Sequence, residues 1–339
     1  MSIAQAASLL SAVVLASALG ACGGPSSGPA VGLDELVSGN PNDGSDVGRG
    51  QLVSTTAVPG GRDRFGLAAA RGYLYLVGGR LDPAFGSSRA DVFAASIGHD
   101  GSLGAWQQTA PLPVPRIVDA IATDGRSLFV IGGCPQFCAD NELEETKRVF
   151  RGTLADDGSV VAWEESEPLP EPRYLHTALA HDGFVHVLGG AGTTTTFRAS
   201  IGSDGRLSAW MPDQPLLKPR KQHASLVLGK HVYVGGGNQQ SPVTWWTDIE
   251  VSTIQADGSL GPWTTIPGDQ FMLQGDLAEY AWAHETGAPR TSFADSLPFS
   301  GERTQLAIED RIYEIYRYQD QGPAPAAPNQ TPVVFVRFR

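Results

Sequence analysis

One unit occurs four times along the chain, and this repetition restricts the fold more than any other feature. Each unit begins with an arginine, continues through two apolar segments and ends the second segment in a pair of glycines. The arginine precedes the first glycine by 16 residues in every unit. The four units are residues 62–79, 116–133, 173–190 and 220–237. A chain with such a period stacks copies of one small structural unit side by side.

A second constant segment follows each glycine pair at a variable distance. It contains Asp-Gly, whose glycine precedes a tryptophan by five residues in all four copies, 100–106, 157–163, 204–210 and 257–263. Asp-Gly between β-rich segments is a strong signal for a hairpin turn, because that turn needs a positive φ. Each unit is therefore predicted to form four short strands, with the tryptophan filling the gap between neighbouring sheets. The 41 glycines and 24 prolines among 339 residues agree with many short elements joined by turns.

The double glycine after an apolar strand, with an aromatic residue beyond it, resembles the kelch repeat, and the resemblance covers about residues 46–339. It implies an all-β fold, a kelch-type β-propeller whose blades are four-stranded sheets. Residues 49–62 read as an outer strand, and residues 303–317 and 333–339 read as strands of a blade that lacks its fourth. We expect the N-terminal strand to complete that C-terminal blade and close the ring. The ring then has five blades with residues 268–302 as an insertion, or six if this segment forms a degenerate blade.

Residues 1–21 are predicted to be the signal peptide of a lipoprotein. Residues 2–21 carry no charge, and their apolar stretch is short for a membrane span. The stretch ends in Leu19-Gly20-Ala21-Cys22, which resembles the lipobox of bacterial lipoproteins. The resemblance implies lipidation of the Cys22 thiol and anchoring in the bacterial cell envelope, with the outer membrane or cell surface favoured over the inner membrane. Residues 22–45 would form a flexible tether. The segment before Cys22 lacks the Lys or Arg with which a signal peptide usually starts, which leaves the true start of the chain and the strength of the signal open. The alternative to a lipoprotein is an ordinary secretory signal that is cut near Ala21.

The repeated arginines are candidates for ligand binding. In kelch propellers, the links between blades and the loops after Gly-Gly share one face, where ligands usually bind near the axis. This places Arg116, Arg173 and Arg220 close to that face, and a guanidinium group suits carboxylates. The alternative, which the recurrence favours, is a structural role in which each arginine, Arg62 included, bonds carbonyls of the neighbouring blade.

Features found in a single repeat are more informative about a site. The fourth repeat alone carries Trp245-Trp246 just before its third strand, and Gln239 and Gln240 lie in the same loop. Adjacent side chains of a strand point to opposite faces, so we expect one tryptophan to be exposed, where it suits stacking on a sugar or peptide. The alternative is that both are buried between blades.

Cysteine and histidine residues are the candidates for a metal site in this sequence. Cys134 and Cys138 follow one glycine pair, and in an exported protein we expect them to form a local disulfide, with a metal pair as the alternative. His176, His181 and His186 are five residues apart, a spacing that alternates faces on a strand, so they do not converge as ligands. We expect no metal and no cofactor.

The function predicted from these observations is a non-catalytic propeller that binds a protein or glycan partner through one loop face. The net charge of −12 and the pI near 5.0 exclude a nucleic-acid binder as the default. No nucleophile elbow or phosphate loop is present. The alternatives are an enzyme acting on a sugar, similar to kelch-type mutarotases, and a structural spacer. An oxidase resembling galactose oxidase is excluded, because both cysteines other than Cys22 lie in one loop. We expect a monomer that contacts the membrane through its lipid anchor only.

Overall fold

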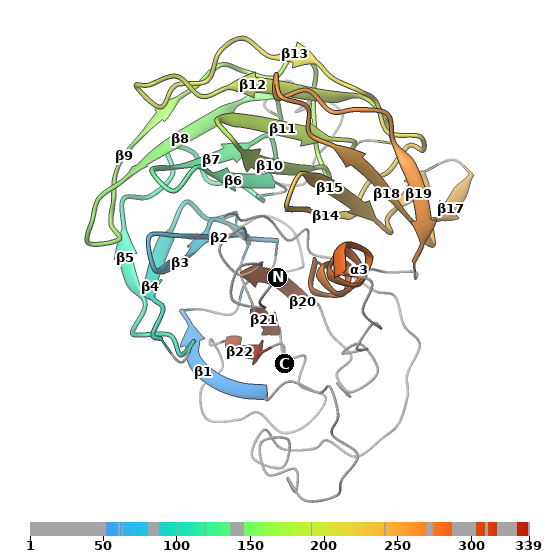
Figure 1. The fold of residues 1–339 in the computed structure, drawn as a ribbon. Helices are drawn as coiled ribbons and strands as arrows, with labels where there is room; N and C mark the ends of the chain where they lie inside the picture. The colour runs from blue at the N-terminus through green and yellow to red at the C-terminus, as the bar shows by residue number, and fades with distance from the viewer. Residues whose placement is uncertain are drawn as a thin grey trace, which may run out of the picture.

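The described residues form a ring of five four-stranded antiparallel sheets, which confirms the all-β propeller (Figure 1). The computed structural model describes residues 52–59, 62, 64–80, 88–99, 101–118, 120–135, 146–190, 192–240, 242–268, 274–286, 303–308, 311–316 and 331–337. In this part of the chain, no helix is long and apolar enough to cross a bilayer.

Four of the sheets are built from consecutive strands, one sheet for each sequence repeat. Blade 1 contains β2 (Gly66–Ala70), β3 (Tyr73–Val77), β4 (Val92–Ser96) and β5 (Gln107–Thr109). Blade 2 contains β6 (Ala120–Thr123), β7 (Ser127–Ile131), β8 (Val149–Leu154) and β9 (Val160–Glu165). Blade 3 contains β10 (Thr177–His181), β11 (Phe184–Leu188), β12 (Thr196–Ser200) and β13 (Met211–Pro212). Blade 4 contains β14 (Ala224–Leu228), β15 (His231–Gly235), β18 (Asp248–Thr253) and β19 (Thr264–Pro267), with an extra hairpin of β16 (Asn238–Gln240) and β17 (Val243–Trp245).

Blade 5 joins the two ends of the described chain. It consists of β20 (Arg303–Ile308), β21 (Arg311–Tyr316), β22 (Thr331–Arg337) and, as its outer strand, β1 (Leu52–Val58). The strands β1 and β22 are antiparallel, with Leu52 opposite Val336 and Val58 opposite Thr331. The predicted closure by an N-terminal strand is therefore confirmed.

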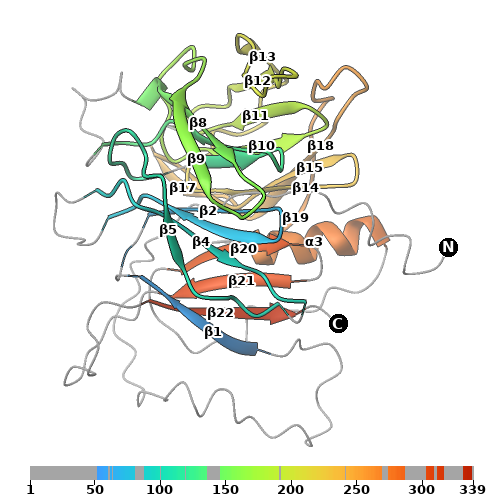
Figure 2. The ribbon, with the colours of Figure 1, turned by 90° about the vertical axis from the view of Figure 1, so that its left-hand side faces the viewer.

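A helix lies at the junction between blades 4 and 5. It is α3 (Gln274–Thr286), the described part of the segment 268–302, and it contacts both β14 and β20 (Figures 1 and 2). Its Leu277 and Ala281 are buried in a cluster with Leu226 and Tyr233 of blade 4. The described residues of this segment are thus helical, whereas the alternative of a degenerate blade required strands. Side chains of the helix fill the space between two sheets.

The tryptophan of each repeat ties its blade to the preceding one. Each indole Nε1 donates a hydrogen bond to a backbone carbonyl of that neighbour: Trp106 to Thr56 at 3.3 Å, Trp163 to Ala110 at 2.8 Å, Trp210 to Glu167 at 2.9 Å and Trp263 to Gln214 at 3.0 Å. A large ring with one polar atom can fill an apolar gap and still satisfy that atom. The predicted role of the tryptophans agrees with these contacts.

The glycine pairs allow the blades to approach closely. Gly132 has a φ of 62°, and a Cβ atom there would lie 2.7 Å from the carbonyl oxygen of Arg173 in the next blade. The amide of Gly190 donates to the carbonyl of Arg220 at 2.7 Å, again across a blade junction. A side chain at either position would separate two sheets.

The Asp-Gly turns predict a clear difference between two glycine-to-alanine substitutions. Gly258 has a φ of 78°, and a Cβ atom there would overlap the ring of Phe184 in blade 3. Gly183 has a φ of 80°, but a Cβ atom there would have no neighbouring atom within 4 Å. We expect Gly183→Ala to cost about 1–2 kcal/mol from backbone strain alone, and Gly258→Ala to cost about 2–5 kcal/mol because of the added overlap. Urea denaturation measures both, and equal losses would contradict the packing of this turn against the neighbouring blade.

Candidate binding site on the loop face

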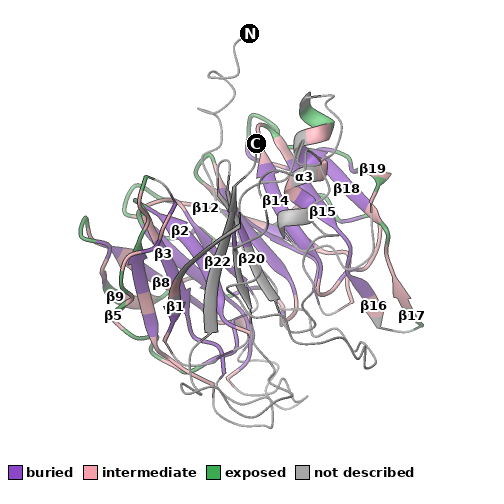
Figure 3. Cartoon of the chain, turned by 90° about the horizontal axis from the view of Figure 1, so that it is seen from below, coloured by how far each residue is buried: buried purple, intermediate pink, exposed green. Residues whose placement is uncertain are grey.

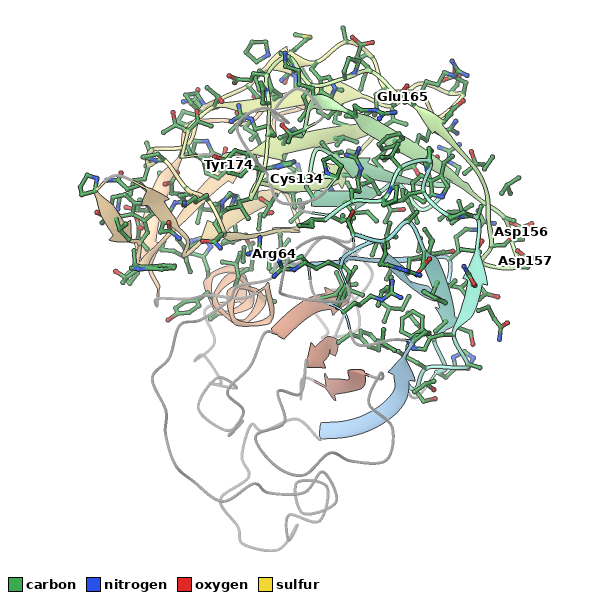
Figure 4. The ribbon with its side chains drawn as sticks, turned by 180° about the vertical axis from the view of Figure 1, so that it is seen from behind. Arg64, Cys134, Asp156, Asp157, Glu165 and Tyr174 are labelled. Carbon is green, nitrogen blue, oxygen red and sulfur yellow. The ribbon has the colours of Figure 1, made fainter. Side chains whose placement is uncertain are left out.

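The links between blades and the loops that follow the glycine pairs lie on one side of the ring, here called the loop face. Each inner strand begins there and each second strand returns there, because neighbouring strands are antiparallel. Arg64, Cys134 and Tyr174 come from blades 1, 2 and 3 on this face and lie toward the middle of the ring, whereas Asp156 and Asp157 lie at its outer edge (Figure 4). The loop face is thus formed jointly by several blades.

The repeated arginines are buried in the blades and hold the end of the second strand. Their Nη1 atoms donate to the carbonyl of the first glycine: Arg62 to Gly78 at 3.2 Å, Arg116 to Gly132 at 2.6 Å and Arg220 to Gly236 at 2.6 Å. Arg173 is also buried and donates to Glu171 Oε1 at 2.6 Å. The bonds to glycine stay within one blade, whereas Arg62 Nη2 also donates at 3.1 Å to the carbonyl of Pro59, just after the outer strand of blade 5. The expected bond to a carbonyl of the neighbouring blade is therefore found for Arg62. Ligand contacts of Arg116, Arg173 and Arg220 stay a prediction. The side chains of these three arginines have almost no exposed surface.

Three of the four arginines lie on an aromatic ring. The guanidinium carbon is 5.1 Å from the ring centre of Phe93 for Arg62, 4.6 Å from that of Phe150 for Arg116 and 5.2 Å from that of Phe197 for Arg173. Each phenylalanine is on the third strand of its blade, seven residues before the aspartate of Asp-Gly. Blade 4 has Glu250 at this position.

Glu250 is fully buried and accepts three hydrogen bonds. Its Oε2 atom accepts from the amide of Leu217 at 2.7 Å, and its Oε1 atom accepts from the amide of Lys218 at 3.1 Å and from Arg220 Nε at 3.0 Å. The nearby Asp248 accepts from Lys218 Nζ and from Arg220 Nη2, both at 2.7 Å. Burial would raise the pKa of Asp248, but the hydrogen bonds and charges of Lys218 and Arg220 outweigh it and lower that pKa. The link from blade 3 to blade 4 is therefore held by two carboxylates.

The extra hairpin of blade 4 is held against the same link. The Nε1 atom of Trp246 donates to the carbonyl of Pro219 at 2.9 Å, and Lys218 Nζ lies 4.8 Å from the centre of the indole ring. Lys221 and Asn238 exchange backbone hydrogen bonds of 2.9 and 3.0 Å at the base of the hairpin. Strand β17 lies at the periphery of the ring, outside the buried strands of blade 4 (Figures 1 and 3).

Aliphatic side chains are exposed both on the link from blade 3 to blade 4 and on the extra hairpin. Leu217 in the link is 53% exposed, and Val243 at the start of β17 is 68% exposed. Trp245 and Trp246 are both partly buried, so the expectation of one clearly exposed tryptophan is corrected. Gln239 is partly buried, and the side chain of Gln240 lies outside the described residues. We call the surface formed by Leu217, Lys218, Val243, Trp245 and Trp246 the blade-4 patch.

Comparisons with known proteins agree with the repeat and the ring. Kelch-like protein 40 of Xenopus laevis is 34% identical over 87 residues, which are 26% of this chain and 13% of the relative. Kelch repeat and BTB domain-containing protein 12 of Danio rerio is 31% identical over 135 residues, 39% of this chain and 20% of the relative. These relatives match the chain over much less than two thirds of their own length. The ring is a kelch-repeat β-propeller.

Other comparisons add little to this assignment. No family model matches the chain. A solved structure titled "Structure of YjhT" aligns over 62% of this chain and 70% of its own, with a TM-score of 0.46 and 14% sequence identity.

Some of the remaining residues predicted from the sequence lie outside the described part of the chain. Cys134 is buried next to the glycine pair of blade 2, whereas Cys138 and Cys22 lie outside the described residues, so the disulfide and the lipid anchor stay predictions. His176 and His186 are both buried but lie in different elements: His176 is in the link just before β10, and His186 is on β11. In the described ranges, no group of three or more His, Cys, Asp and Glu side chains is placed to hold a metal ion.

Glu250 and Leu217 are the residues that sequence reasoning missed. The signal was present, because Glu250 occupies the position of Phe93, Phe150 and Phe197 at a constant distance from Asp-Gly. Leu217 lies three residues before the repeated arginine, where the other three links carry Pro59, Pro113 and Pro170. Comparing the third strands and the links across repeats reveals both exchanges in blade 4.

Proposed function

We propose that this chain is a lipid-anchored module of the bacterial envelope whose kelch propeller binds a protein partner at the blade-4 patch. The observation that carries the proposal is the exposure of Leu217 and Val243 on a link and a hairpin that hydrogen bonds hold in place. Apolar side chains on a support that is already ordered lose little conformational freedom when a partner binds, so more of the contact energy contributes to affinity. The anchor rests on the sequence around Cys22, and we expect the module to act as a monomer.

The chemistry of the patch favours a protein over a glycan. Leu217 and Val243 offer aliphatic surface without hydrogen-bonding groups, and the ammonium of Lys218 is compensated by Asp248 at 2.7 Å. Sugars need polar partners for their hydroxyl groups, whereas an aliphatic or aromatic side chain of a protein needs only apolar contact. We therefore expect the partner to place at least one apolar side chain against Leu217 or Val243.

The test is site-specific photocrosslinking in intact cells that produce the full-length chain. The photoreactive residue replaces Val243, and in a matched control it replaces Val161, which is 63% exposed on β9 of blade 2. We expect one envelope protein to be captured from position 243 and not from position 161. Capture at both positions, or of no protein at either, would contradict the proposal. Recovery of a polysaccharide from position 243 would replace it with a glycan-binding function.

Val243→Asp should weaken binding of the captured protein about tenfold or more, because a charge would be buried in the apolar contact. The melting temperature should change by less than about 2 °C, since the side chain is mostly exposed. Titration calorimetry with the purified partner and a thermal melt measure the two effects. Val161→Asp is the control, and it should leave the affinity unchanged.

A further inference from the structure

Glu250 is a costly residue that the repeat itself does not need. The desolvation of a buried carboxylate is unfavourable, and replacing buried charges by apolar groups is often neutral for stability. In blades 1 to 3 a phenylalanine at this position is sufficient beneath the arginine, as the short distances to Phe93, Phe150 and Phe197 show. The carboxylate in blade 4 must therefore have a role other than holding Arg220 in place.

The exchange at Glu250 is matched by an exchange in the link. Where the other blades have phenylalanine, the preceding link has proline three residues before the arginine, and proline has no amide hydrogen to satisfy. Blade 4 has Leu217 at that place, and its amide donates to Glu250 Oε2 at 2.7 Å. The same junction is thus built in two ways. One has proline in the link and phenylalanine on the third strand, and the other has leucine in the link and glutamate on the third strand. Only the second exposes a leucine side chain.

We propose that Glu250 is a positioning residue that orders Leu217 and Lys218 in the blade-4 patch. Its two carboxylate oxygens hold the amides of both residues, while Asp248 holds the ammonium of Lys218 beside Trp246. The link is thereby fixed with the Leu217 side chain outward, and this order precedes binding. The proposal rests on the proposed function for its consequence, partner recognition, but its structural part concerns the free protein.

The test uses Glu250→Phe in the full-length chain, which gives blade 4 the residue of the other blades. Arg220 keeps Asp248 and the carbonyl of Gly236 as partners, so we expect the variant to fold. Residue-resolved hydrogen exchange of the free protein should show about tenfold or more faster exchange at the amides of Leu217 and Lys218, with the other blades unchanged. Photocrosslinking from position 243 should capture the partner about tenfold less efficiently.

The double variant Glu250→Phe with Leu217→Pro provides the matched control. It reproduces the proline and phenylalanine of the other three junctions, so it should melt like the wild-type protein and still fail to bind. It also keeps the test decisive if Glu250→Phe alone does not fold. Unchanged exchange at Leu217 and Lys218 in Glu250→Phe, or full binding by the double variant, would overturn the proposal. If no protein is captured by the wild-type chain, the proposed function fails, while the exchange measurement still decides whether Glu250 orders the link.

Discussion

Arg220→Met is expected to lower the free energy of unfolding by about 3–5 kcal/mol, because it leaves a buried carboxylate without its charged partner. Arg220 Nε lies 3.0 Å from Glu250 Oε1, and neither side chain has exposed surface. The substitution also removes the donor of the Gly236 carbonyl. Methionine has a similar length and packs well, so the loss reflects charge and hydrogen bonding more than a cavity.

The matched control for this effect is Arg62→Met in blade 1. Its Asp91 partner retains the guanidinium group of Arg89 at 2.9 Å, so no carboxylate loses all compensation. We expect a cost of about 1–3 kcal/mol, chiefly from the Gly78 carbonyl that loses its donor. Urea denaturation near neutral pH compares the two variants. A loss for Arg62→Met as large as that for Arg220→Met would show that the carboxylate pair of blade 4 does not account for the effect.

Acid is expected to destabilise the propeller through two buried histidines at neighbouring blade junctions. Burial and the positive charge of Arg220 lower the pKa of His223 to about 3, and burial together with Arg173 and His223 lowers the pKa of His176 well below its ordinary value. His223 Nε2 is 3.0 Å from Thr177 Oγ1 of blade 3, so the ring lies at the junction between blades 3 and 4. Both side chains take up protons in the unfolded chain at an ordinary pKa of about 6.5 and remain neutral in the folded one.

The sign of this effect follows from proton binding. The unfolded state binds more protons than the folded state below about pH 6.5. The contribution of the two neutral histidines to the free energy of unfolding is therefore fully present above that pH and is lost as the pH is lowered. Each histidine contributes a slope of about 1.4 kcal/mol per pH unit, and the two together about 2.7 kcal/mol. Asp213 and Asp248, whose pKa values are also lowered, add to the loss only at more acidic pH.

His223→Phe isolates one of the two contributions. Blade 1 carries Phe65 at the same repeat position, so the ring is compatible with this site in the fold. Urea denaturation at about pH 7 and about pH 5 should show that the variant loses about 2 kcal/mol less stability over this interval than the wild-type chain. An unchanged slope would mean that His223 becomes protonated in the folded protein.

The repeated parts of the molecule could be predicted from sequence because each motif occurs several times along the chain. The glycine pairs, the Asp-Gly turns and the tryptophans recur at constant spacing, and each tryptophan donates to a carbonyl of the preceding blade. The closure by β1 was predictable too, because the C-terminal blade lacked one strand. These inferences depend on backbone geometry and on burial, which a local pattern reports well.

The parts that occur once were harder to predict. The helix α3 lies in a segment for which the repeat pattern predicts only an insertion or a degenerate blade, and its sequence has no strong apolar periodicity. Glu250 stands alone among apolar neighbours in β18, and its partners Leu217 and Lys218 are more than 30 residues away in sequence. Their contact depends on tertiary packing between a link and a third strand, which no local pattern specifies.

The pairing of β1 with β22 also determines when the ring can be completed. Leu52–Val58 precede the strands of blades 1 to 4 in the chain, whereas their partner strand Thr331–Arg337 follows all of them. Blades 1 to 4 contain only strands close in sequence, so they can form early in folding, whereas β1 remains an unpaired edge until it meets β22. An unpaired strand is a site for aggregation. Ring closure therefore depends on a pairing that spans nearly the whole described chain, and slow pairing prolongs the exposure of one strand edge to other molecules.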